Sequence, residues 1–142
     1  MRWLIRRVLK RASGDVFEDD IHFGDTLSIG RGTDQAVYIT DLRAALAHVR
    51  VTALGNGRYR VESLIAAGVR VDGTSQMNAT VASGSSIDIG ATRIRLIEPP
   101  NDFEAAVEIS VLDEAQIEAA RVVPRLTLTE AGLGKRRWSW AL

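Results

Sequence analysis

The most informative stretch of the chain is VRVTALGNGRYRVE, residues 49–62. Apolar and charged residues alternate in its first three positions and again in its last five, on either side of Asn56-Gly57. Because side chains of a strand point alternately to opposite faces, each run predicts a strand with one buried face. Asn and Gly both tolerate positive φ, so the dipeptide predicts a hairpin turn between the two strands.

The same two-residue period recurs further along the chain. It is present in Val69-Arg70-Val71, Ile87-Asp88-Ile89 and Ile94-Arg95-Leu96, and Asp72-Gly73 adds a second strong turn signal. No proline precedes Pro99 to interrupt these strands. Many short strands separated by turns predict an all-β sandwich or barrel.

The chain begins with the basic segment MRWLIRR, residues 1–7. A secretory signal peptide needs an uninterrupted apolar run of about 7–15 residues, and arginines interrupt this one. We therefore expect an exposed strand here, in preference to a short amphipathic segment.

Length and composition limit the class of protein. A chain of 142 residues suits one domain with an extension, and 46% apolar residues are enough to build a core. The 18 basic and 18 acidic residues cancel, which argues against a dedicated nucleic-acid-binding protein. The absence of cysteine excludes disulfides and thiolate chemistry and favours a cytoplasmic location.

The pattern changes at Glu98-Pro99-Pro100-Asn101, because a proline pair cannot continue a central strand. We therefore expect a β-sandwich over residues 1–97 and an acidic extension over residues 98–142. Within the extension, the alternation at residues 107–111 favours a further strand. The sequence Asp113-Glu114-Ala115-Gln116 has the form of a capping box and predicts a short helix.

The chain ends with the basic, tryptophan-containing segment GKRRWSWAL, residues 134–142. Such segments are typical of the cytoplasmic edge of a membrane span. A span needs at least about 17 further apolar residues, which would have to lie beyond Leu142. Two interpretations stay open: a frayed tail, or the end of the cytoplasmic domain of an inner-membrane protein.

Four segments, taken in order, resemble the forkhead-associated (FHA) domain family. They are Leu27-Ser28-Ile29-Gly30-Arg31, Val37-Tyr38-Ile39, the run from Ala44 to Val51, and the run from Gly68 to Gly73. The resemblance covers about the first two thirds of the chain. It implies a sandwich of short antiparallel strands that recognises phosphothreonine peptides with loops at one end.

Several residues match the family motifs directly. Gly30 and Arg31 match the Gly-Arg pair, whose arginine reaches the bound peptide and its phosphate. His48 matches the histidine that braces the binding loops. Gly73 matches the glycine of the Val-Asn-Gly turn, with Asp72 in place of the asparagine. The resemblance therefore implies a ligand role for the arginine and structural roles for the other matches.

Other positions depart from the family pattern. Ala45 stands where the family has the phosphate-binding serine, and Leu46 where it has arginine. Ala67 replaces the asparagine that holds the peptide backbone, so that only Gly68 remains of the Asn-Gly-Thr motif. Each charge-assisted hydrogen bond contributes roughly 1.5–3 kcal/mol, so the two alanines would weaken phosphopeptide binding about a hundredfold.

Motifs for catalysis are missing from the sequence. The two histidines, His22 and His48, do not form a His-Glu-x-x-His motif, and no P-loop or nucleophile elbow is present. We therefore expect neither an enzyme nor a bound metal or cofactor.

The sequence thus predicts a protein-interaction module that binds a protein or phosphopeptide and depends weakly or not at all on phosphothreonine. Its candidate ligand-binding residues are Arg31, Arg43, Gly68 and Arg70. Two alternatives stay open. One is genuine phosphothreonine binding, with the arginines and backbone amides replacing the lost side chains. The other is a structural or self-assembly domain.

Overall fold

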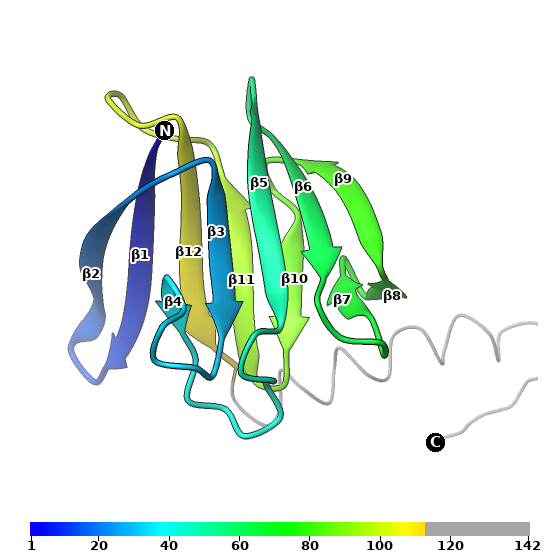
Figure 1. Cartoon of the computed structure of the whole chain (residues 1–142). Coiled ribbons are helices and arrows are strands. Elements are labelled where there is room, and N and C mark those ends of the chain that lie inside the picture. The colour runs from blue at the N-terminus through cyan, green and yellow to red at the C-terminus, as the bar shows by residue number, and fades with distance from the viewer. Residues whose placement is uncertain (113–142) are drawn as a thin grey trace, which may run out of the picture. The chain divides into compact units, whose positions relative to one another are not determined.

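The structure, a computed structural model, describes residues 1–112, which form twelve strands in two facing sheets (Figure 1). The first sheet has the order β2 (Gly14–Phe23), β1 (Arg2–Arg11), β12 (Ala105–Val111), β11 (Thr92–Ile97), β10 (Ser86–Ile89), β7 (Val69–Val71) and β8 (Thr74–Gln76). The second has the order β4 (Val37–Tyr38), β3 (Thr26–Gly30), β5 (Val49–Gly55), β6 (Arg58–Ser63) and β9 (Asn78–Ala82). The predicted all-β sandwich is confirmed.

The predicted hairpins form where the turn residues indicated. Asn56 and Gly57 have φ values of 56° and 70° between the paired strands β5 and β6. Asp72 and Gly73 have φ values of 49° and 85° between β7 and β8. Positive φ at both central residues is the requirement of a type I′ turn, which these residue types meet at low cost.

The core lies between the two sheets and is built from the alternating apolar residues. Its largest fully buried side chains include Trp3 and Tyr59, whose ring centroids are 6.0 Å apart. The Tyr59 hydroxyl donates to the Ile97 carbonyl at 3.0 Å and accepts the Ala106 amide at 3.1 Å. Because Tyr59 belongs to β6 and its partners lie at the end of β11 and in β12, this hydroxyl links the two sheets.

Two strand pairs differ from the predicted antiparallel arrangement. Strand β1 runs parallel to β12, and β3 runs parallel to β4, so both sheets are mixed. The partners β1 and β12 lie at opposite ends of the described chain, and no local turn chemistry can indicate their relative direction.

The N-terminal segment forms a strand, but the start of that strand is not exposed. Trp3, Leu4 and Ile5 are buried because β1 lies between β2 and β12 instead of at an edge. Only the later part of the strand, which ends at Arg11, becomes exposed.

The sandwich also continues beyond the boundary predicted at residue 97. Strand β12 pairs with β11 and β1, and its residues Ala105, Ala106 and Val107 are buried. The proline pair occupies the connection between β11 and β12, where the Phe103 amide donates to the Pro100 carbonyl at 3.1 Å. The short helix predicted to begin at the capping box 113–116 and to end before Pro124 lies outside the described residues, as does the segment 134–142. Among residues 1–112, no helix is long and apolar enough to cross a membrane.

Replacing the sheet-bridging hydroxyl tests its contribution to stability. We expect Tyr59→Phe to lower the free energy of unfolding by about 1–3 kcal/mol, because the buried Ala106 amide loses its acceptor. Urea denaturation measures the change. Tyr38→Phe, at an exposed tyrosine, serves as control and should change stability by less than about 0.5 kcal/mol. Equal effects of the two substitutions would contradict the role assigned to Tyr59.

Candidate functional site

Two loops meet at the lower end of the sandwich in Figure 1, where β3 ends and β5 begins. One follows β3 (residues 31–36), and the other precedes β5 (residues 39–48). Backbone hydrogen bonds hold them together: the Arg31 amide donates to the Ala45 carbonyl at 2.8 Å, and the Gly32 amide donates to the Leu46 carbonyl at 3.0 Å. The His48 amide donates to the carbonyl of Ile29 in β3 at 2.9 Å. These contacts fix the segment 39–48, which we call the site loop, against the end of β3.

Gly30 is required by the close approach of these two backbones. A Cβ atom built at this position would overlap the Leu46 carbonyl group. The overlap involves backbone atoms, which cannot rotate away as a side chain would. The structural role expected for Gly30 therefore has a direct steric basis.

His48 braces the site loop from inside. Its Nδ1 atom accepts the Ala45 amide at 2.9 Å, and its carbonyl accepts the Leu64 amide at 2.9 Å. The residue is only 7% exposed, and burial lowers the pKa of its imidazole below the ordinary value of 6.5. The neutral ring, with Nδ1 unprotonated, is the form that can accept this hydrogen bond.

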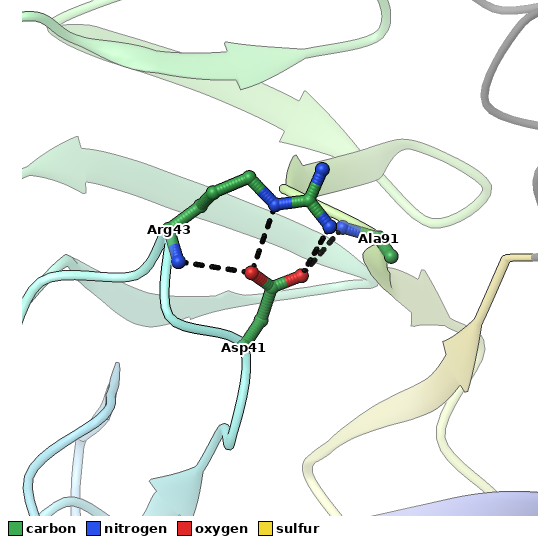
Figure 2. Close-up of polar contacts among 3 residues, drawn as sticks. All are labelled: Asp41, Arg43 and Ala91. Carbon is green, nitrogen blue, oxygen red and sulfur yellow. Dashed lines mark hydrogen bonds and ion pairs between the residues drawn. The ribbon is translucent and has the colours of Figure 1, made fainter.

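Asp41 links the site loop to the turn between β10 and β11 (Figure 2). Its carboxylate accepts the Arg43 amide at 2.9 Å and the Arg43 Nε and Nη2 atoms at 2.9 and 2.8 Å. It also accepts the Ala91 amide at 2.8 Å. The Arg43 guanidinium, followed by the backbone donors, holds the pKa of Asp41 well below the ordinary carboxyl range. Because β10 and β11 lie in the other sheet, Asp41 joins the two sheets at this end.

The turn itself leaves room for this ion pair. A Cβ atom at Gly90 would come within 2.7 Å of Arg43 Nε and would overlap the Asp41 carboxylate. Gly90 also has a φ of 58°, which a side chain at this position would disfavour. Asp41 and Gly90 were not predicted as site residues from the sequence, because the Asp41–Ala91 hydrogen bond at this turn joins residues 50 positions apart.

Two of the predicted ligand residues meet at the site loop. Arg43 belongs to this loop, and Arg31, which follows β3, contacts it. Arg31 Nε donates to the carbonyl of Ala44, the residue that follows Arg43. The charge of Arg43 is balanced by Asp41, whereas Arg31 makes no ion pair within the part of the chain that the structure describes. Of these two arginines, Arg31 is therefore the one whose charge is available to an anionic ligand.

The other two predicted ligand residues lie on or next to β7. Gly68 precedes this strand with a φ of 80°, and the carbonyl of its neighbour Ala67 accepts the Ser75 hydroxyl at 3.1 Å. Arg70 Nη1 donates to the Gly73 carbonyl at 3.2 Å, in the turn at the other end of β7. No side-chain hydrogen bond or ion pair among residues 1–112 joins Arg70 to the site loop.

Apolar side chains project from the site loop. Leu42 and Leu46 are 84% and 61% exposed, although both lie within a few residues of the buried Ala44. Exposed leucines near a half-buried arginine without an ion-pair partner in residues 1–112 suit a protein surface better than a small anion. Among the described residues, no group of three or more His, Cys, Asp or Glu side chains could hold a metal ion.

The architecture matches solved FHA domains. The FHA domain of CT664 from Chlamydia trachomatis superposes with a TM-score of 0.54 at 16% identity, over 67% of this chain and 96% of that one. A domain studied for phosphothreonine-dependent FHA interactions gives 0.51 at 19% identity, over 70% of this chain and 95% of that one. No protein-family model matches the sequence, and neither does any curated protein. The chain has the FHA fold.

Removing the charge of Asp41 tests its role in joining the sheets. We expect Asp41→Asn to lower the free energy of unfolding by about 1–3 kcal/mol, because the Ala91 amide and Arg43 lose a shared acceptor. The native pKa is depressed, so the wild-type contribution should be present above the ordinary value of 3.8 and lost as the pH falls below it. Asp102→Asn, at an exposed loop position, is the control and should leave denaturant unfolding nearly unchanged.

Protonation of His48 should weaken the fold. Burial depresses its native pKa below 6.5, so the unfolded chain binds more protons just below that pH. Stability should therefore be full above about pH 6.5 and should fall as the pH is lowered through and below that value. Unfolding measured between pH 8 and 5 should show this loss in the wild type and in His22→Asn, but not in His48→Asn. An unchanged slope in His48→Asn would refute the assignment.

Proposed function

We propose that this chain is a protein-interaction module that binds a segment of another protein at the site loop, with weak or no dependence on phosphothreonine. One observation carries the proposal. The loop is braced through the Ala45 amide and His48 Nδ1, yet the side chain at position 45 is a methyl group. The scaffold that positions a ligand is present, while a hydroxyl that would bind phosphate is not.

The remaining side chains support the same conclusion. The side chain of Ala67, two residues before β7, has no amide group, and the Ala67 carbonyl accepts the Ser75 hydroxyl. Arg43 is held in a two-point ion pair with Asp41, so that binding a phosphate would require competition with that carboxylate. Arg31 remains available to an acidic side chain or a carbonyl of the partner. Leu42 and Leu46 supply apolar contact area beside it.

The cellular setting is part of the proposal. The cysteine-free composition supports a cytoplasmic place of action. The basic, tryptophan-containing residues 134–142 support attachment at the cytoplasmic face of a membrane. Partners of this FHA-fold module would then be cytoplasmic or membrane-proximal proteins.

A restoration experiment tests the weak phosphate dependence. Matched phosphorylated and unphosphorylated threonine peptides, titrated by calorimetry, should differ less than about tenfold in Kd for the wild type. Ala45→Ser combined with Ala67→Asn should strengthen binding of both peptides and should increase the preference for the phosphorylated one by about tenfold, since the one hydrogen bond restored to the phosphate contributes roughly 1.5 kcal/mol or more. Adding Arg31→Ala to this variant should abolish the gain.

Two outcomes would overturn the proposal. A clear micromolar preference of the wild type for the phosphorylated peptide, lost in Arg31→Ala, would establish genuine phosphothreonine binding. A stable dimer in light scattering, disrupted by Leu46→Ser and accompanied by no peptide binding, would instead establish a self-assembly domain.

A further inference from the structure

Within residues 1–112, strand β2 is the long edge strand of the first sheet. It pairs with β1 along its full ten residues, from Gly14 opposite Arg11 to Phe23 opposite Arg2. No strand within residues 1–112 lies on its other side. Nine of its ten residues are exposed. The other three edge strands, β8, β4 and β9, have only three, two and five residues.

One face of β2 carries its large apolar residues. Phe17 and Phe23 are 54% and 69% exposed, and Ile21 lies between them on the same face. The guanidinium of Arg6 on β1 lies 5.2 Å from the centre of the Phe17 ring and forms two hydrogen bonds with Asp19. Aromatic residues with this much exposed area on an uncapped edge are unusual in a solitary domain, because such edges template pairing with other chains.

The opposite face of β2 carries acidic residues. On this face Glu18 and Asp20 are neighbours, with Val16 before them and His22 after them. Neither carboxylate forms an ion pair in the described part of the chain. A strand added to the free edge would therefore meet two uncompensated negative charges beside apolar side chains.

These acids argue against a second copy of β2 as the occupant. In a two-fold antiparallel pair of nearly full-length β2 strands, Glu18 would lie opposite Glu18 in one register and opposite Asp20 in the next. Like charges directly opposite one another destabilise a strand pair. A basic strand has the complementary charge, and β1 already provides the example, because Arg6 and Lys10 pair with acids of β2.

We propose that the free edge of β2 binds an extended segment of a partner protein in which basic and apolar residues alternate. The segment adds a strand beside β2 through backbone hydrogen bonds, its basic side chains meet Glu18 and Asp20, and its apolar side chains cover Phe17 and Phe23. This site lies in the first sheet and does not rest on the function proposed for the site loop. Failure of either proposal leaves the other standing.

A ten-residue peptide in which arginine and valine alternate is a suitable probe, because it matches the length of β2 and presents basic side chains on one face and apolar side chains on the other. Fluorescence polarisation with the full chain should detect binding that weakens with added salt. A charge-reversed peptide, with glutamate at the five basic positions, should bind at least about tenfold more weakly. Amide hydrogen exchange, followed by NMR, should slow specifically in β2.

Variants of the chain locate the contact. Glu18→Gln combined with Asp20→Asn should weaken peptide binding by about two- to thirtyfold, the range expected for two exposed ion pairs. Asp34→Asn, at an exposed acid beside the other loops, is the matched control and should bind as the wild type does. Unfolding curves confirm that both variants remain folded, since the changes lie on exposed positions.

A peptide N-methylated at alternate residues separates strand addition from simple charge attraction. It keeps its charges but loses the backbone donors of one edge, so its affinity should fall at least about tenfold. Equal binding of the methylated peptide, equal binding of the charge-reversed peptide, or exchange protection confined to the site loop would each overturn the proposal. A concentration-dependent dimer disrupted by Phe17→Ser would also overturn it, in favour of a second copy.

Discussion

The close approach of two backbones at the end of β3 is the constraint on which the candidate site depends. Ile29 is buried in the core, and the next residue, Gly30, has no Cβ to obstruct the Leu46 carbonyl. The following amides, from Arg31 and Gly32, then donate into the site loop. Because the contact is made by backbone atoms, it survives changes in the side chains that a ligand would touch.

The groups that hold the site loop are separate from the side chains at which this chain departs from the FHA motifs. The loop is held by the buried imidazole of His48 and by the Asp41 carboxylate, which connects it to the opposite sheet. Neither support needs a serine at position 45. The same carboxylate neutralises Arg43, so the support of the loop also reduces the positive charge available to an anion.

Parts of this arrangement were predictable from the sequence, and parts were not. Alternation predicted β5, β6, β7, β10 and β11, while Asn56-Gly57 and Asp72-Gly73 predicted their turns. Strand β2 gave no such signal, because almost all of its residues are exposed and no buried face imposes a period. The proline pair suggested that the sandwich ended at residue 97, yet a proline-containing connection is compatible with a hairpin that returns to the same sheet. Among the site residues, Gly30, Arg31 and His48 were identified from the resemblance to FHA domains, whereas Asp41 was not.

Local patterns were therefore enough to predict an all-β sandwich and its tight turns, since periodicity and turn preference are properties of neighbouring residues. Ala45 and Ala67 were singled out only by the resemblance to FHA domains. The tertiary structure decided what depends on contacts between distant segments. It paired β1 with β12 in parallel, and it brought the Asp41 carboxylate to the Ala91 amide, 50 residues away in the sequence. The physical reason is that hydrogen bonds and ion pairs form wherever the fold brings their partners together, and sequence separation does not reveal where that is.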